Sequence, residues 1–568
     1  MDSFDVVVIG AGWFGLAAAK TYIQLHPTAR IVVFESAASC GGTWSQARLY
    51  PGLKSNNMLG TYEYPDFPMT PQNYDVQQHG HIPAATLHRY LTDYAKHFGV
   101  FENIRFETRV ELIEQESTGS WLLSTTTKNM NSEFPTDVQV RTAKLIVATG
   151  LTSTPNMPHY AHEETFSAPL FHAKDFCAQA PHLKEARNVV VVGGAKSAYD
   201  VAHAMVEQGS TVDLIIRPNG HGPVWISPRL VTPFKKRLDA LLNVRWMTWM
   251  SPCPWGGEDG FPGPRNFLHG TKVGRWIVDL FWKVLGGEVV STNGYDGHPE
   301  LKKLKPWNSA FWIGSGLSIL NYESDLFAMV KEGKIRVHID NIDHLESKKV
   351  VLSGGQVLYA DAMICATGWK KESSLKFIGL GEEEFGLPHS KVEKIKLERE
   401  ADQKILSMFP RLADQPQQRF ELKTSDPLRM YRFIVPPTFV AKRTIAFAGM
   451  VSCVSTATCA SNTGLWISAF LDGKLERIAR SQQEITDEVM LHTQWGKWRY
   501  PCGYGACLPD FVFDGVPYFD MLLRDLGLET HRQKSLWREL TWPCYPAVYD
   551  GLVEEWQAKE EGRGMAKR

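Results

Sequence analysis

The chain has 568 residues, which predicts roughly three or four domain-sized units at ordinary domain sizes. Apolar residues make up 43% and charged residues 22%. These values are typical of a globular protein and exclude intrinsic disorder, a collagen-like fibre and a small disulfide scaffold. The 61 basic and 62 acidic side chains leave a net charge of −1, without the basic excess of a nucleic-acid-binding protein.

The first predicted unit lies at the start of the chain. Residues 5–9 form a short β-branched run that ends at Gly10, which predicts a buried strand. A helix over residues 10–25 and a strand over residues 30–35 follow. This order predicts a βαβ unit with a parallel sheet and a right-handed crossover.

Three glycines mark the turn of this unit. Gly10, Gly12 and Gly15 follow the strand and open the helix. The first makes the tight turn, the second lets the backbone approach a pyrophosphate, and the third packs helix against strand. The helix N-terminus can then hold the phosphates, and Glu35, at the end of the next strand, can accept from ribose hydroxyls. The spacing predicts a dinucleotide site.

A second glycine segment follows shortly after Glu35. It reads Gly41-Gly42-Thr43-Trp44. In disulfide reductases of this architecture we expect a redox cysteine pair just after such a Gly-Gly-Thr. Trp44 stands there instead and Cys40 has no close partner in the sequence, which disfavours dithiol chemistry.

These segments carry a resemblance. With Ser55-Asn56-Asn57 and Tyr64-Pro65-Asp66-Phe67-Pro68, the sequence resembles the flavin-containing monooxygenases, above all microbial and fungal members, from Val6 to about Gly473. The resemblance implies that the first fingerprint binds FAD, with Gly42, Thr43 and Trp44 as further contacts. It also implies that an asparagine before Pro-Asp-Phe-Pro stabilises the oxygenated flavin. Counting back from Pro65 assigns this catalytic role to Asn56, with Asn57 as the alternative and a cofactor contact.

A second βαβ unit begins at residue 188. Residues 188–192 and 212–216 predict strands, and residues 196–208 predict the helix between them. Two more predicted strands, residues 145–150 and 363–368, end in Ala-Thr-Gly. At each of these segments we expect the chain to pass from one unit into the other. The sequence therefore predicts an α/β protein with two nested dinucleotide-binding (Rossmann-like) domains, an insertion and a C-terminal extension.

The turn of the second unit resembles the family's NADPH fingerprint. It departs from Gly-x-Gly-x-x-Gly, because Ala195 and Ala198 replace the second and third glycines. The methyl group of Ala195 pushes the pyrophosphate outward, which suits a cofactor that visits transiently. The predicted contacts of NADPH lie at this turn and after the next strand: Gly193, Lys196, Ser197 and Arg217. Arg217 can meet the 2′-phosphate. Thr367, in the second Ala-Thr-Gly, is a further predicted cofactor contact, where the chain returns from the NADPH unit to the FAD unit.

Residues 166–176 lie between the two sites and resemble the family's Phe-x-Gly-x₃-His fingerprint, with Ala168 in place of the glycine. Phe176 stands where Baeyer–Villiger enzymes carry Trp, which favours other oxygenations. His172 is expected to have a structural or domain-linking role, with acid–base catalysis as the alternative.

Residues 225–325 differ in composition. Eight of the 18 tryptophans lie between Trp225 and Trp312, which predicts a separate insertion. Three interpretations are open: this region covers the cofactor cleft, touches a membrane surface, or forms ordinary aromatic core.

Two uncharged stretches are candidates for membrane-spanning segments. Residues 6–19 are too short to span a bilayer. Residues 444–471 contain seven Ser, Thr and Asn side chains between Ser452 and Thr463, which favour a strand at the FAD site followed by a helix from Asn462 to Leu471. No integral membrane span is expected.

The cysteine pattern and the N-terminus indicate the compartment. Nine cysteines without a CxxC pair favour reduced thiols over disulfides or a structural zinc site, and no metal site is predicted. The acidic start is unlike a signal peptide. The expected location is the cytoplasm.

The resemblance implies an enzyme that uses FAD, NADPH and O₂ to insert one oxygen atom into a small lipophilic substrate through a C4a-(hydro)peroxyflavin. It also implies a role in secondary metabolism. The alternatives are a Baeyer–Villiger enzyme, an uncoupled NADPH oxidase or flavin dehydrogenase, and a non-catalytic scaffold. The sequence leaves the oligomeric state open.

The predicted division of the chain alternates between the two cofactor domains. It is FAD-binding in 1–155 and 370–480, NADPH-binding in 156–224 and 326–369, the Trp-rich insertion in 225–325, and the C-terminal extension in 481–568.

Overall fold

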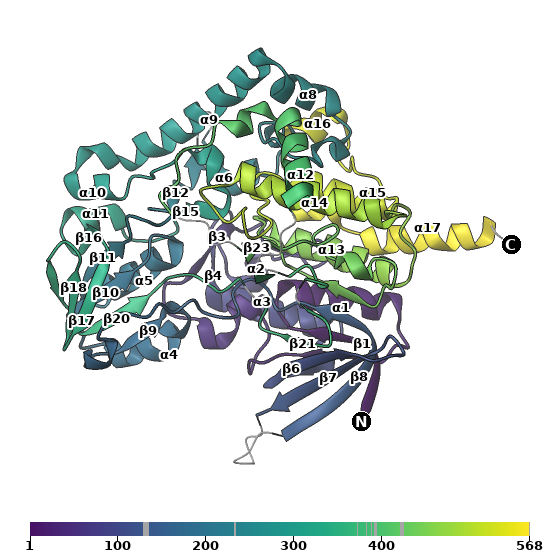
Figure 1. Cartoon of the computed structure of the whole chain (residues 1–568), viewed down its shortest axis with the longest axis horizontal. Coiled ribbons are helices and arrows are strands. Elements are labelled where there is room, and N and C mark those ends of the chain that lie inside the picture. Colours follow the sequence, from purple (N-terminus) through teal and green to yellow (C-terminus); the bar gives the residue numbers. More distant parts are fainter. Residues whose placement is uncertain are drawn as a thin grey trace.

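The computed structural model describes residues 1–128, 136–231, 235–371, 373–381, 383–387, 389–390, 395–420 and 425–566. The two largest β-sheets lie at the left and at the lower right of the view, and a largely helical layer lies above them (Figure 1).

The larger sheet has eight strands in the order β21-β6-β7-β8-β1-β2-β5, and β24 pairs with the last residues of β8. Its centre is parallel and fully buried, because β1 lies between β2 and β8 and helices cover it. The strands are β1 Asp2–Ile9, β2 Ile31–Phe34, β5 Ile104–Arg105, β6 Thr108–Gln115, β7 Trp121–Thr127, β8 Thr136–Val147, β21 Lys376–Ile378 and β24 Ile445–Phe447.

The smaller sheet has five strands in the order β16-β11-β10-β20-β9, all paired in parallel. Helix α5 (Lys196–Glu207) connects β10 to β11 and packs on both. The strands are β9 Leu170–His172, β10 Asn188–Val192, β11 Thr211–Ile216, β16 Ile335–Ile339 and β20 Ala362–Cys365. The predicted α/β fold class with two dinucleotide-binding units is confirmed.

Several element boundaries differ from the prediction. Helix α1 (Trp13–Leu25) starts later than Gly10, because the glycines form the turn itself. Strand β8 ends at Val147 and β20 at Cys365, so both Ala-Thr-Gly segments lie beyond their strands. Helix α13 (Thr456–Leu471) starts before Asn462 and packs along α1, where Gly464 lies close to the backbone of Ala17.

The Trp-rich region is mostly helical. Four of its eight tryptophans are buried, namely Trp225, Trp255, Trp282 and Trp312, so much of the region is aromatic core. Its elements are β12 Trp225–Ser227, β13 Leu230–Val231, β14 Lys236–Arg237, α6 Leu238–Leu241, α7 Arg245–Thr248, α8 Pro262–Gly270, α9 Lys272–Asn293, α10 Pro299–Lys303 and β15 Leu317–Ile319.

The C-terminal region completes the helical layer. Helix α15 packs against α13, and α14 packs against α12. The helices here are α12 Ile395–Met408, α14 Gln482–Arg499, α15 Gly515–Leu526, α16 Leu536–Thr541 and α17 Leu552–Ala566.

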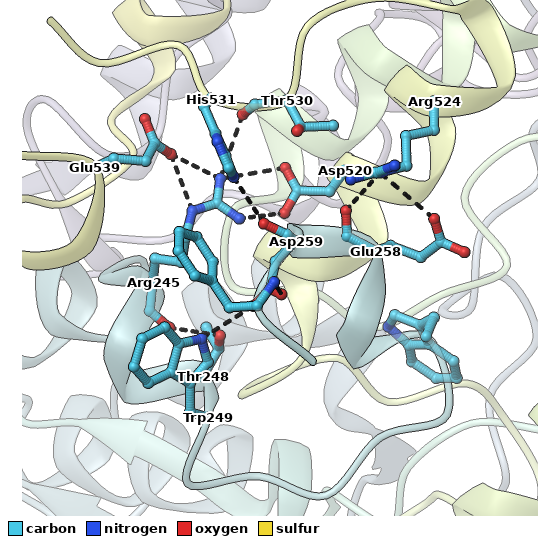
Figure 2. Close-up of polar contacts among 12 residues, drawn as sticks. Arg245, Thr248, Trp249, Glu258, Asp259, Asp520, Arg524, Thr530, His531 and Glu539 are labelled. Carbon is cyan, nitrogen blue, oxygen red and sulfur yellow. Dashed lines mark hydrogen bonds and ion pairs between the residues drawn. The ribbon is translucent and has the colours of Figure 1, made fainter. Parts of the chain in front are cut away.

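A buried ionic cluster joins this C-terminal layer to the Trp-rich region (Figure 2). Arg245 of α7 is fully buried, and its guanidinium is paired with Asp520 of α15 and with Glu539 of α16, the latter at 2.7 Å. The backbone carbonyl of Asp259 accepts from His531 at 2.7 Å. Because removing one partner of a buried ion pair is costly, these contacts fix the two regions together.

Candidate active site

The first glycine turn, Gly10 to Gly15, needs glycine at two positions. Gly10 has φ +105°, and a Cβ there would strike the carbonyl oxygen of Ala148. A Cβ on Gly15 would strike the carbonyl oxygen of Gly10. The sequence folds into a tight strand–turn–helix here because no side chain occupies these contacts.

The N-terminus of helix α1, directly after this turn, presents backbone N–H groups that can donate hydrogen bonds. Gly12 is its N-cap, and no side chain caps the helix. The first N–H groups of a helix have no partner within it and carry the positive end of its dipole. This end of α1 can therefore hold a phosphate group.

Glu35 lies buried beside the same turn. One carboxylate oxygen accepts from the N–H of Ala11 at 2.8 Å, and the other accepts from the N–H of Ala37 at 2.8 Å. Each carboxylate oxygen has a second acceptor site. Glu35 therefore fixes the turn and can still accept from a ribose hydroxyl.

The segment Gly42–Trp44 lies directly over the turn. The N–H of Gly41 donates to the carbonyl of Ala11 at 2.8 Å, and Gly12 and Gly42 face each other so closely that a Cβ on Gly12 would lie 3.5 Å from the Gly42 Cα. The Thr43 hydroxyl is 3.1 Å from that of Thr152. Side chains on the two glycines would fill this cradle, so the geometry fits a dinucleotide backbone passing through it.

Trp44 contributes to an aromatic wall beside the turn. Its indole N–H donates to the Tyr62 hydroxyl at 3.3 Å. The Tyr62 ring is 4.8 Å from that of Trp13, the first residue of α1, and the indole N–H of Trp13 has no partner among the residues described. This wall shields one side of the cradle from water.

Asn56 and Asn57 lie on β3 (Lys54–Met58) and point in opposite directions. The Asn57 amide donates to the carbonyl of Val454, just before α13, at 3.1 Å. The Asn56 Oδ1 accepts from the Ser318 hydroxyl of β15 at 3.1 Å. In the described part of the chain the Asn56 Nδ2 has no partner, so it remains available as a donor.

The second glycine turn, Gly193 to Ala198, joins β10 to α5. Gly193 has φ +146°, and a Cβ there would strike the carbonyl oxygen of Ala366. A Cβ on Gly194 would strike the carbonyl oxygen of Gly222. Ala195 is the exposed N-cap of α5, and no side chain caps this helix either. The second turn therefore also offers free N–H groups to a phosphate.

Lys196 and Ser197, two predicted contacts of this turn, have different surroundings. The Lys196 ammonium is ion-paired with Asp200 and donates to the Asn321 side chain at 2.9 Å, so its charge is already engaged. Ser197 is exposed in the first turn of α5. The role of Lys196 as a phosphate contact stays a prediction, weakened by this pairing.

A group of basic side chains lies at the carboxyl end of β11. Arg217 is exposed there and has no ion pair within the described ranges. The Lys371 ammonium lies 4.5 Å from the centre of the Tyr504 ring, and the His221 ring lies 5.6 Å from the same ring. Burial, then the charges of Arg217 and Lys371, lowers the pKa of His221, and burial lowers that of Lys371. This cluster can attract a phosphate.

Sequence reasoning missed Lys371 and His221. The only sequence signal was the pair Lys370-Lys371 directly after the second Ala-Thr-Gly and Trp369. Tyr504, which brings Lys371 and His221 together, lies more than a hundred residues away in the C-terminal region.

Thr367 lies in one of two chain segments, residues 154–156 and 367–370, which run antiparallel to each other. Its hydroxyl donates to the carbonyl of Asn156 at 2.7 Å. The backbone N–H of Asn156 donates to Gly368 at 3.0 Å, and that of Lys370 donates to Thr154 at 2.9 Å. Thr367 holds this double connection together, and its contact with a cofactor stays a prediction.

His172 supports the same connection. Its Nδ1 accepts from the N–H of Lys174 at 3.1 Å, so Nε2 carries the proton and donates to the Gly368 carbonyl at 2.9 Å. Burial lowers the pKa of His172, which keeps the ring neutral. With both ring nitrogens engaged, the geometry favours a linking role over acid–base catalysis.

A solvent-open pocket lies beside this connection. The carboxyl ends of β8 and β24 contribute Thr149, Gly150 and Phe447, and Lys371 and Leu508 also line the pocket. Open α/β sheets bind ligands at such carboxyl edges.

Comparison with known proteins agrees with these features. Residues 7–247 match the model of the pyridine nucleotide-disulphide oxidoreductase family. The FAD-dependent monooxygenase resA of Aspergillus sclerotiorum is 34% identical over 99% of this chain and 99% of its own length. An FAD-dependent monooxygenase of Pyrenophora dematioidea is 35% identical over 94% of this chain and 99% of its own length. The chain belongs to the FAD-dependent monooxygenases.

The monooxygenase shares its fold with a solved structure, cyclohexanone monooxygenase from Rhodococcus sp. Phi1 bound to NADP⁺. The TM-score is 0.57 at 16% identity, over 92% of this chain and 97% of the other. The predicted family is confirmed.

The nine cysteines, all within the described ranges, form no disulfide bonds, and Cys40 lies buried beside Thr92. Within the part of the chain that the structure describes, no group of three or more His, Cys, Asp and Glu side chains could hold a metal ion, and no helix is long and apolar enough to cross a membrane.

Proposed function

We propose that this monooxygenase holds FAD at the first glycine turn and receives NADPH at the second. One oxygen atom of O₂ goes to a small lipophilic organic substrate and the other leaves as water, with two electrons supplied by NADPH. The fungal sources of the two similar relatives support a place in secondary metabolism.

One observation carries the proposal. Two glycine turns, on separate parallel sheets, each lead into a helix that no side chain caps. A protein that binds only one dinucleotide needs one such turn, whereas hydride transfer between two dinucleotides needs both. The Asn56 Nδ2, which has no partner in the described part of the chain, adds a hydrogen-bond donor that oxygen chemistry could use.

The residues of the chain position and shield the reacting groups. Helix α1 would hold the pyrophosphate and Glu35 the ribose of FAD, while Trp44 and Tyr62 would exclude water from one side. FAD, when bound, supplies the hydride acceptance and oxygen activation. The Asn56 Nδ2 can donate a hydrogen bond to oxygen held nearby.

Specificity for NADPH is expected from the basic cluster. Arg217 stands after β11, where it can pair with the 2′-phosphate, and Lys371 adds a second cation. NADH lacks that phosphate and gains nothing from either charge.

The test follows the flavin of the purified holoprotein. The protein is reduced with NADPH without oxygen and then mixed with oxygenated buffer, while absorbance and released hydrogen peroxide are recorded. We expect a transient species that differs from both oxidised and reduced flavin, and little peroxide once a productive substrate is present. Immediate return to oxidised flavin with equimolar peroxide, whichever substrate is offered, would contradict the proposal and indicate an oxidase.

The same measurement distinguishes the two asparagines. Asn56→Ala is expected to shorten the life of the transient species without loss of FAD. Asn57→Ala is expected to weaken FAD retention, because the Asn57 amide ties β3 to the segment before α13. The reverse pattern would assign the catalytic role to Asn57.

A Baeyer–Villiger outcome, the alternative oxygenation, would show as ester or lactone products from ketones.

A further inference from the structure

Helix α9 presents apolar side chains to solvent along its outer face. Val273, Trp276, Leu280 and Val284 recur at spacings of three and four residues and are 44–64% exposed. We call these four residues the α9 apolar face. The opposite side of the helix, including Val278 and Trp282, is buried in the core. An ordinary surface helix carries charged residues where this face lies.

A second exposed patch lies on and after α16. Leu536, Trp537 and Trp542 are 49–72% exposed, and we call them the α16 patch. Helix α16 packs on α7, and Trp246 of α7 lies 6.3 Å from Phe281 of α9, centre to centre. Helix α7 therefore contacts both α9 and α16, and these two helices lie in the upper part of the molecule (Figure 1).

The charges around both patches are positive. Lys272 and Lys283 lie on α9, and Lys534 and Arg538 lie beside the α16 patch, with the Arg538 guanidinium 4.3 Å from the centre of the Trp542 ring. None of these four cations has an ion pair within the described ranges.

The acids of the same helices are engaged elsewhere. Asp279 is paired with Arg411 at 2.7 Å, Glu539 with Arg245 at 2.7 Å, and Glu288 is half-buried with a partner. The surface around the two patches is therefore apolar and aromatic with a cationic rim.

We propose that the α9 apolar face and the α16 patch bind the surface of an anionic lipid membrane. Tryptophan prefers the head-group region of a bilayer, and lysine and arginine pair there with anionic lipids. An amphipathic helix that lies in the membrane plane combines these two features. The proposal is independent of the chemistry proposed above.

A second copy of the chain fits this surface less well. A two-fold interface would place the same patch of both copies together, so that Lys272 and Lys283 would face like charges. Lysine is also depleted in protein–protein interfaces. The rim therefore favours lipid over self-association.

The test is sedimentation of the purified holoprotein with vesicles of phosphatidylcholine, alone or mixed with phosphatidylserine. We expect binding to the mixed vesicles that decreases with salt. Trp276→Ser with Leu280→Ser should lower the bound fraction at least about tenfold. Lys272→Gln with Lys283→Gln should lower the partition coefficient about 30-fold, at ~1 kcal/mol for each cation.

Tyr359→Ser is the matched control, because Tyr359 is 65% exposed on β19 (Val357–Tyr359), outside both patches. Its binding should equal that of the wild type, and far-ultraviolet circular dichroism should show every variant folded. Equal binding of all variants, or no binding of wild type to mixed vesicles, would overturn the proposal. A dimer that Trp276→Ser converts to a monomer, without vesicle binding, would show instead that the surface joins two copies.

Discussion

The two glycine turns of this monooxygenase share a geometry but differ in their surroundings. The first is covered by the segment Gly42–Trp44 and clamped by the buried Glu35. The second is open, with an exposed alanine as N-cap, an exposed Ser197 and the exposed Arg217 beside it. A covered turn suits a cofactor that stays through many turnovers, and an open turn suits one that enters and leaves.

The largest expected effect comes from Gly15→Ala in the first turn. The added methyl group meets the Gly10 carbonyl, and such overpacking costs about 1–3 kcal/mol. We expect the protein to lose bound FAD and to unfold at a lower temperature. Flavin absorbance per protein and a thermal melt measure both effects. Gly99→Ala is the control, because Gly99 has φ +66° but open space around its Cβ position; equal flavin loss in this variant would contradict the assignment.

Gly193→Ala tests the second turn separately from the first. Its methyl group would strike the Ala366 carbonyl, so the turn that we propose receives NADPH must open. We expect FAD content to stay near wild type while kcat/KM for NADPH falls about 100-fold. Reduction by dithionite should remain normal. Loss of FAD in this variant would show that the two turns do not act separately.

Removing a positive charge beside the second turn is expected to have a smaller effect on the use of NADPH. Arg217→Gln and Lys371→Met should each raise KM for NADPH about 10-fold or more, because each removes a charge-assisted contact to phosphate. KM for NADH should change little in steady-state assays. An equal increase with both nucleotides would show that these residues support the fold and not the 2′-phosphate.

The smallest expected effect concerns pH. Burial lowers the pKa of His172 in the folded protein, so protonation favours the unfolded state. Its contribution to stability is present above pH 6.5, the ordinary histidine value, and is lost as pH falls below it. His172→Gln keeps a donor towards Gly368 but cannot titrate. Thermal melts between pH 7 and pH 5 should therefore decline less steeply in this variant; parallel slopes would contradict the role of His172.

Local sequence patterns predicted the units that bind dinucleotides. The β-branched runs before Gly10 and Gly193 could form only buried parallel strands, and the glycines could serve only as turns. The start of α13 was missed because Thr456, Thr458 and Ser461 are poor helix formers on their own. Packing against α1 and α15 supplies the stability that propensity lacks.

The sequence by itself determined the fold class, the family and both glycine turns, because each depends on neighbours within about thirty residues. Only the tertiary structure decided which side chains converge from distant segments. It turned Lys196 towards Asp200, and it placed Lys371 and His221 on Tyr504. It also left the apolar side of α9 facing outward. Such outcomes depend on how helices pack across hundreds of residues, which periodicity along the chain does not encode.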